Sequence, residues 1–285
     1  MPLVSTTELY EDAERLGYAL GAWDTCGGQI DEIEAIFQAA EEMNSPAIIS
    51  DGYGPMERYF GLEYFATIIR MRAAKSSVPV ALHLDHAFEF DYVIRAIRSG
   101  FTSVMFDGSR LSYEKNVQTT RKVVEVAHSV GVSVEAELGS VGGLEGDSFS
   151  HTDKSLYTDP DIAHDFVEET GIDSFAPAIG NAHGFYTQEP KLDFERLKRI
   201  REKVRLPLVL HGATGIPLDE VKKAISLGIR KINLATIVHH IYVKGLREHL
   251  KKYPEDERNV LQGAREPLKK LIKEQMKAFG SARVK

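Results

Sequence analysis

Cysteine is almost absent from this sequence. The single thiol, Cys26, excludes an internal disulfide framework and is typical of a protein from a reducing compartment. The sequence also lacks any run of 18 apolar residues that could cross a bilayer, and its first residues do not resemble a signal peptide. These absences together predict a cytoplasmic protein.

A basic surface is lacking as well. The chain carries 35 Lys and Arg against 42 Asp and Glu, a formal net charge of -7, with no long basic run. Nucleic acids and anionic membranes are bound by clustered Lys and Arg, so neither is expected as a partner. Small molecules and other proteins remain as candidate partners.

Short apolar runs alternate with longer amphipathic stretches along the chain. The runs predicted as strands are Tyr18 to Trp23, Ala47 to Ser50, Val78 to Leu84, Ser103 to Phe106, Ser133 to Leu138, Ser174 to Ala178, Pro207 to His211 and Lys231 to Leu234. The stretches predicted as helices are Ile30 to Glu42, Glu57 to Lys75, Tyr92 to Arg98, Tyr113 to Val130, Ile162 to Glu169, Leu192 to Val204 and Leu218 to Ile225.

This alternation favours a single α/β domain. Eight strand-helix units in about 250 residues predict a (β/α)8 TIM barrel, whereas a doubly wound sheet normally has fewer strands. No early glycine fingerprint of a doubly wound sheet follows the first strand. We therefore expect residues 1–285 to form one domain, with a C-terminal helical extension at about residues 256–285.

Histidines stand at the predicted ends of three strands. The motif His83-Leu84-Asp85-His86 closes the third strand, and two His-Gly pairs begin at His183 and His211. The carboxyl ends of barrel strands surround one pocket, so these side chains and Glu137 are expected to converge there. Three protein ligands and an open position are typical of catalytic zinc. Histidines outside these motifs, including His239, are predicted to be surface or core residues.

Six ordered motifs then carry a family resemblance. They are HLDH at 83–86, GFTSVMFDGS at 100–109, VEAELGSVGG at 134–143, AIGNAHGFY at 178–186, LHGATGI at 210–216 and KINLAT at 231–236. Over nearly its whole length the chain resembles the class II, metal-dependent fructose-bisphosphate and tagatose-bisphosphate aldolases. The resemblance implies a (β/α)8 barrel with a catalytic zinc, assembled as a homodimer or homotetramer, and it also allows a monovalent cation.

The resemblance also implies roles for individual residues. It makes His86, His183 and His211 the zinc ligands, with Glu137 at or beside the metal. Asp85 would handle the proton of the C4 hydroxyl, and Glu145, in the long loop after the fifth strand, would exchange the proton at C3. The predicted contacts of the phosphorylated ketose substrate are Asp24, Gly184, Gly212, Thr214, Asn233, Thr236 and, reaching the far phosphate from a neighbouring subunit, Arg258.

The first reading of the function is reversible cleavage of a ketose 1,6-bisphosphate to dihydroxyacetone phosphate and an aldehyde such as glyceraldehyde 3-phosphate. Departures from the family pattern, notably Thr187 where a lysine is expected and Asp24 where an asparagine is expected, leave a second reading open. In it, a ketose 6-phosphate is cleaved, or is epimerised at C4 by retro-aldol chemistry. A non-catalytic partner subunit is the third reading. A Schiff-base aldolase is disfavoured because Lys231 begins the eighth strand, away from the catalytic rim.

Overall fold

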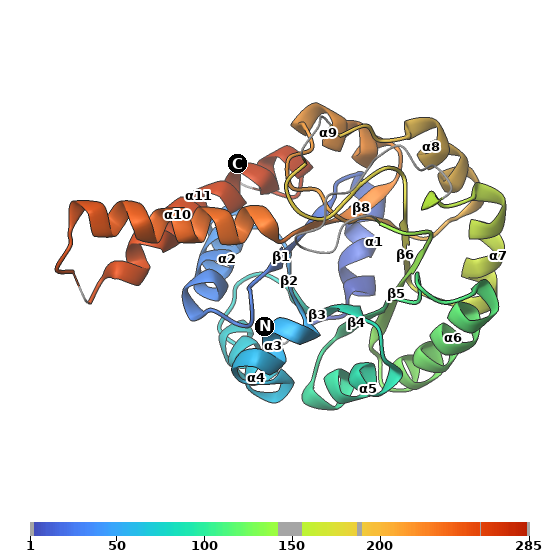
Figure 1. The fold of residues 1–285 in the computed structure, drawn as a ribbon, viewed down its shortest axis with the longest axis horizontal. Helices are drawn as coiled ribbons and strands as arrows, with labels where there is room; N and C mark the ends of the chain where they lie inside the picture. The colour runs from blue at the N-terminus through green and yellow to red at the C-terminus, as the bar shows by residue number, and fades with distance from the viewer. Residues whose placement is uncertain (1–2, 142–155, 187–189, 257, 284–285) are drawn as a thin grey trace.

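Eight strands pair in chain order, and the last pairs with the first, so the sheet closes into a parallel barrel (Figure 1). The computed structural model describes residues 3–141, 156–186, 190–256 and 258–283. The strands are β1 (Leu20–Asp24), β2 (Ala47–Gly52), β3 (Val80–Ala87), β4 (Ser103–Phe106), β5 (Ser133–Leu138), β6 (Ser174–Pro177), β7 (Leu208–Leu210) and β8 (Ile229–Leu234). Most strand residues are buried, as expected for a parallel sheet covered by helices, and the predicted fold class is confirmed.

Helices surround the barrel (Figure 1). They are α1 (Thr6–Leu16), α2 (Ile30–Met43), α3 (Tyr53–Tyr59), α4 (Leu62–Ala73), α5 (Phe90–Ser99), α6 (Tyr113–Ser129), α7 (Pro160–Thr170), α8 (Phe194–Lys203), α9 (Leu218–Ser226), α10 (Thr236–Lys252) and α11 (Val260–Phe279). None of the helices in the described ranges is long and apolar enough to cross a membrane.

Two helical regions differ from the sequence-based expectation. The prediction of one helix from Glu57 to Lys75 was wrong, because Gly61 adopts a φ of +81° between α3 and α4 and breaks the helical path there. Helix α1 was not predicted, although Ser5 and Glu8 form a capping box at its start. Its buried face packs against the first residues of the strands, so α1 closes the amino-terminal end of the barrel.

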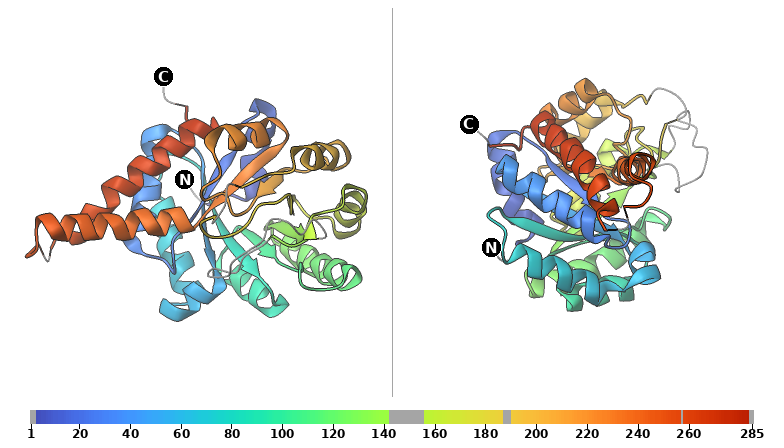
Figure 2. Two further views of the ribbon diagram at one scale, coloured as in Figure 1. Left: turned by 45° about the horizontal axis from the view of Figure 1, so that its top comes forward. Right: turned by 90° about the vertical axis from the view of Figure 1, so that its left-hand side faces the viewer.

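Helices α10 and α11 form a hairpin that projects from the barrel (Figures 1 and 2). The pair is closely packed: a side chain at Gly245 would meet the backbone of Ala264 at 2.7 Å. At the other end of α11, Phe279 stacks on the buried Trp23 of β1 with ring centroids 6.4 Å apart. The hairpin is thus anchored to the barrel at its base, while its tip, near Arg258, extends away from it.

Candidate active site and metal centre

The carboxyl-terminal end of β3 has an irregular backbone. The pairing of β3 with β4 shifts register between Leu84 and Ala87, and His86 adopts a left-handed φ of 41°. Successive side chains of a regular strand point to opposite faces, so Asp85 and His86 could not otherwise serve the same pocket. A left-handed non-glycine residue costs on the order of 1 kcal/mol or more, and such strain is concentrated at functional sites.

Three imidazoles converge at the carboxyl-terminal mouth of the barrel. His86, His183 and His211 each offer a ring nitrogen, and these atoms lie within 4.8 Å of one another. The closest pair is His86 Nε2 and His211 Nδ1, at 2.9 Å. Ring centroids of His86 lie 4.8 Å from those of His183 and 4.6 Å from those of His211. The structure therefore brings together all three histidines that the sequence suggested as ligands.

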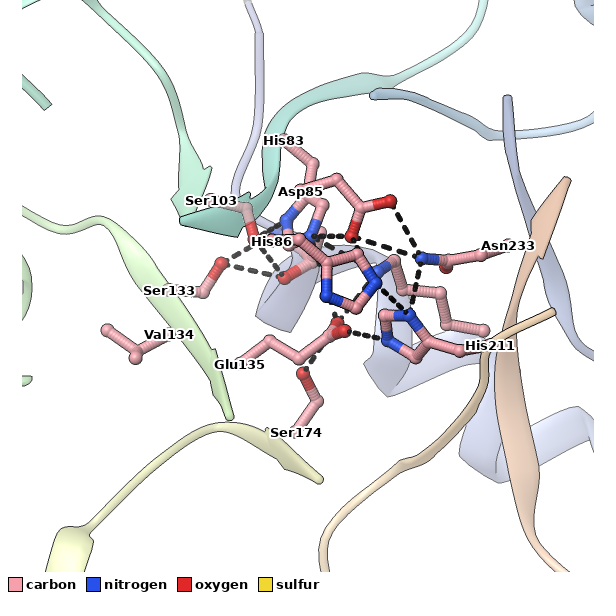
Figure 3. Close-up of polar contacts among 12 residues, drawn as sticks. His83, Asp85, His86, Ser103, Ser133, Val134, Glu135, Ser174, His211 and Asn233 are labelled. Atoms are coloured by element: carbon pink, nitrogen blue, oxygen red, sulfur yellow. Dashed lines mark hydrogen bonds and ion pairs between the residues drawn. The ribbon is translucent and has the colours of Figure 1, made fainter. Parts of the chain in front are cut away.

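Carboxylates fix the outer ring nitrogens of two of these histidines. Asp107 Oδ2 lies 2.8 Å from His86 Nδ1. Glu135 Oε1 lies 2.8 Å from His211 Nε2 (Figure 3). A carboxylate on the far nitrogen sets the tautomer and orientation of a metal-binding histidine. The inner nitrogens are thereby directed toward one point, so the residues present fit a divalent metal ion.

The charge state of His86 also bears on this fit. Burial lowers the pKa of His86, but Asp85 and Asp107 outweigh it and raise that pKa to about 10. Burial, together with nearby His86, lowers the pKa of His183 to about 4, so His183 is neutral near pH 7 and able to bind a metal. A divalent metal ion held by His86, His183 and His211 would replace the proton on His86.

Glu137 lies beside the three histidines. Its side chain is buried, Oε1 accepts a hydrogen bond from the Val141 amide at 3.0 Å, and Oε2 has no hydrogen-bond partner in the described part of the chain. Its carboxylate groups with His86 and Asp107 within 4.8 Å, a cluster that shares only His86 with the histidine trio. Burial, reinforced by the charge of Asp107, raises the pKa of Glu137 to about 8.

Asp85 is placed for proton transfer. Both of its carboxylate oxygens accept from Asn233 Nδ2, at 3.2 and 3.1 Å, and Oδ1 lies 3.9 Å from His86 Nε2 (Figure 3). Burial raises the pKa of Asp85, but the neighbouring imidazoles, His86 and then His211, bring it below its usual value. Asp85 is therefore an ionised carboxylate, held in position by Asn233, that can accept a proton.

A cavity of about 670 Å³ opens above these groups. It is lined by residues of several strand ends and loops, among them Asp24, Tyr53, Asp85, His86, Phe88, Asp107, Arg110, Glu137, His183 and His239. A larger groove of about 940 Å³ lies outside the barrel between α6 and α7, with no part in this cluster. The chemistry-bearing residues thus point to the smaller cavity as the active site.

The predicted donor contacts cluster near the ends of β7 and β8. Gly212 has a φ of +61°, and a Cβ there would lie 2.2 Å from the Ala182 carbonyl oxygen, so only glycine fits. Thr214 Oγ1 accepts from the Ile237 amide at 3.3 Å, which joins the β7 loop to the start of α10. Thr236 is the first residue of α10, and a side chain at Gly184 would meet no atom of the described residues beyond its chain neighbours within 4 Å. Barrel enzymes commonly bind phosphate in this region.

Asp24 has a partner that the sequence did not suggest. His239 Nε2 lies 3.0 Å from Asp24 Oδ1, and His239 Nδ1 lies 3.6 Å from Glu32 Oε1. Burial lowers the pKa of His239, but these two carboxylates raise it to about 11, so the imidazole is charged at neutral pH. The sequence predicted His239 to be a surface or core residue; the structure adds that it pairs with Asp24 at the lining of the cavity. Its only signal was its place near the start of the helix after β8, the strand that closes on β1.

The predicted site residue Glu145, and Thr187, lie outside the described residues. The predicted site residue Arg258 is exposed, lies between α10 and α11, and is not among the described residues that line the cavity. A role for Arg258 at an active site therefore requires the cavity of a neighbouring subunit.

Comparisons with known proteins agree with this geometry. The sequence profile of the family described as fructose-bisphosphate aldolase class-II matches residues 4–283. A probable fructose-bisphosphate aldolase from Bacillus subtilis (strain 168) is 46% identical over 291 residues, covering 99% of each chain. A fructose-bisphosphate aldolase from Staphylococcus aureus (strain Mu50) is 43% identical, again over 99% of each. Among solved structures, the YdjI aldolase from Escherichia coli K12 superposes with a TM-score of 0.86 at 35% identity, covering 98% of each chain.

Proposed function

Since the chain belongs to the class II fructose-bisphosphate aldolase family, we propose that it reversibly cleaves a ketose 1,6-bisphosphate into dihydroxyacetone phosphate and an aldehyde such as glyceraldehyde 3-phosphate. Zinc, held by His86, His183 and His211, is the proposed cofactor. The observation that carries the proposal is the convergence of these histidines, two of which have their outer nitrogens on carboxylates.

A bound divalent metal supplies Lewis-acid stabilisation for the negative charge that develops on the donor half when the C3–C4 bond breaks. The chain's own residues move the protons. Asp85, ionised and held by Asn233, accepts the C4 hydroxyl proton during cleavage and returns it during condensation. Glu145 is the proposed residue that exchanges the proton at C3. Glu137, beside His86, is the proposed fourth group at or next to the metal.

The donor half of the substrate is proposed to lie over the ends of β7 and β8. Backbone N–H groups around Gly184, Gly212 and Thr214, with the first turn of α10 at Thr236, suit a phosphate. Asp24, on β1 next to β8, completes this side of the cavity with its ion-pair partner His239. A monovalent cation near the donor phosphate belongs to the same proposal.

The assembly and location follow from other observations. We propose a homodimer or homotetramer in which Arg258 of one subunit reaches the far phosphate in the next, supported by its exposed place on a projecting hairpin. A cytoplasmic location is proposed from the single cysteine. The acidic net charge supports the absence of nucleic acid or membrane partners.

Metal removal and substrate comparison test the proposal. Chelation should abolish cleavage of fructose or tagatose 1,6-bisphosphate, and added zinc should restore it; the corresponding 6-phosphates, assayed in parallel, should be poorer substrates. His183→Ala should lose bound zinc as well as activity. His128→Ala is the matched control, because it removes a histidine that contacts a carboxylate, Asp173, on the outside of the barrel. Full activity in metal-free protein, or better turnover of a 6-phosphate, would contradict the proposal.

A further inference from the structure

Most charged groups around the active-site cavity already have a partner of opposite charge. Its described lining includes four Asp and Glu side chains, those of Asp24, Asp85, Asp107 and Glu137, and only one Lys or Arg, which is Arg110. The two charged imidazoles of the lining lie against carboxylates, His86 against Asp107 and His239 against Asp24. A phosphate monoester carries about -1.5 to -2 charges at neutral pH and is repelled by such carboxylates. An anionic substrate end therefore needs a cation that no carboxylate already occupies, and among the described lining residues of a single chain Arg110 offers one.

Arg110 is held beside the metal centre by an aromatic ring. It lies in the loop between β4 and α6, with its guanidinium carbon 4.5 Å from the centre of the Phe88 ring. Phe88 in turn stacks on His86, with ring centres 6.5 Å apart and an interplanar angle of 26°. Stacking orients the flat face of a guanidinium and leaves the N–H groups at its edge available to a ligand. Arg110 makes no hydrogen bond or ion pair with another described residue, so those donors have no competing acceptor there.

The position of Arg110 distinguishes the two halves of a substrate. In a closed barrel of eight strands, β4 lies across the mouth from β8. The proposed donor site occupies the β7 and β8 side, near Gly212 and Thr214, and the three histidines lie between the two sides. A group near Arg110 and Phe88 therefore belongs to the aldehyde half, at the end remote from the donor phosphate.

We propose that Arg110 is a specificity-determining residue that binds the terminal anionic group of the aldehyde half, a phosphate or a carboxylate. This inference rests on the aldolase function proposed above and deepens it, because it adds a residue of the same chain to the recognition of the anion that Arg258 of the neighbouring subunit is proposed to reach. The bidentate N–H edge of arginine suits either anion.

The condensation reaction provides the test, with dihydroxyacetone phosphate as donor and three aldehydes: glyceraldehyde 3-phosphate, uncharged glyceraldehyde, and succinic semialdehyde, which ends in a carboxylate. Arg110→Ala should lower kcat/KM for the preferred charged aldehyde by about 10- to 100-fold, which corresponds to the loss of one charged hydrogen bond. The kcat/KM for uncharged glyceraldehyde should change by about twofold or less. Arg110→Lys should recover part of the loss, since lysine keeps the charge but not the planar fork. Arg283→Ala, which removes a guanidinium from the Tyr18 ring outside the cavity, should leave all three values unchanged.

The outcomes are separable. The inference is supported if the wild-type enzyme prefers one charged aldehyde to glyceraldehyde and Arg110→Ala loses that preference. The charged aldehyde that is preferred then identifies the anion as a phosphate or a carboxylate. Equal losses for charged and uncharged aldehydes would overturn it, because Arg110 would then act only on the shape of the site. It would also be overturned if Arg258→Ala abolished the discrimination and Arg110→Ala did not. A wild-type enzyme that condenses no aldehyde would instead remove the proposed function itself.

Discussion

Replacement of Glu135 should weaken both the barrel and its metal site. Glu135 is 1% exposed, and its carboxylate has two close partners: Oε1 lies 2.8 Å from His211 Nε2, and Oε2 accepts from Lys231 Nζ at 2.8 Å. Ser174 Oγ is a more distant donor to Oε2, at 3.5 Å (Figure 3). Lys231 is fully buried, and its other polar neighbour is His83 Nε2 at 3.1 Å. Burial, with the charge of Lys231, lowers the pKa of His83, so His83 is neutral and cannot replace the carboxylate as a counter-charge.

The expected magnitudes follow from these contacts. In Glu135→Gln, the neutral amide can accept from only one of the two donors and directs its own N–H2 toward the other. The variant leaves the buried ammonium of Lys231 without a counter-charge. Its free energy of unfolding should therefore fall by about 3 kcal/mol, at the lower end of the cost of breaking a buried ion pair. His211 also loses its anionic partner, which should weaken zinc binding by about 10- to 100-fold. The double variant Glu135→Gln with Lys231→Met removes both charges, so its stability loss should fall below the sum of the two single losses by about 0.5 to 3 kcal/mol.

Two measurements check this prediction. Urea unfolding of metal-free protein can be followed by Trp23, the only tryptophan, which is fully buried. Zinc affinity can be measured by competition with a chromophoric chelator. His128→Gln, which alters a histidine–carboxylate contact with Asp173 outside the barrel, is the control and should leave zinc affinity unchanged. Strictly additive stability losses, or unaltered zinc binding in Glu135→Gln, would refute the reasoning.

The remaining predictions concern Asp85 and His239. Asp85→Asn should lower kcat for cleavage by about 10²-fold or more, because the general base is lost, while the zinc content should stay constant because the proposed ligands are kept. Steady-state kinetics and metal analysis measure the two quantities. An unchanged kcat would contradict the role assigned to Asp85. His239 has a folded-state pKa of about 11, above the unfolded value of about 6.5, so its stabilising contribution is complete below about pH 6.5 and is lost as pH rises toward 11. The difference in unfolding free energy between wild type and His239→Gln should accordingly be larger at about pH 6 than at about pH 9, and a difference that grew with pH would contradict the ion pair with Asp24 and Glu32.

The sequence could predict the barrel and the convergence of three histidines because both depend on local signals. Strand ends mark the rim of a barrel, so His86, His183 and His211 could be assigned to one pocket from their positions alone. The left-handed backbone of His86 could not be foreseen, because it comes from a register shift against β4 rather than from any residue preference.

Long-range closure explains what else the sequence could not provide. His239 meets Asp24 only because β8 pairs with β1, which brings together residues from opposite ends of the chain. Helix α1 carried a capping box but gained its importance from contacts with distant strands, such as the Thr6 amide donating to Ser133 Oγ at 3.1 Å. Arg110 had no motif of its own; its position became meaningful once Phe88 and His86 were seen beside it.

The buried contacts of Glu135 also determine when this part of the barrel can be completed during protein synthesis. Domains assemble as units while the ribosome delivers the chain from its N-terminus. His86 leaves the ribosome early, but His211 lies on the loop after β7 and Lys231 on β8, so neither partner of Glu135 exists until most of the chain has been made. A chain stalled before residue 231 would hold an unpaired edge on β1 and an uncompensated Glu135 inside an open sheet. We therefore expect the buried network around the proposed metal site to be complete only after β8 has closed the barrel.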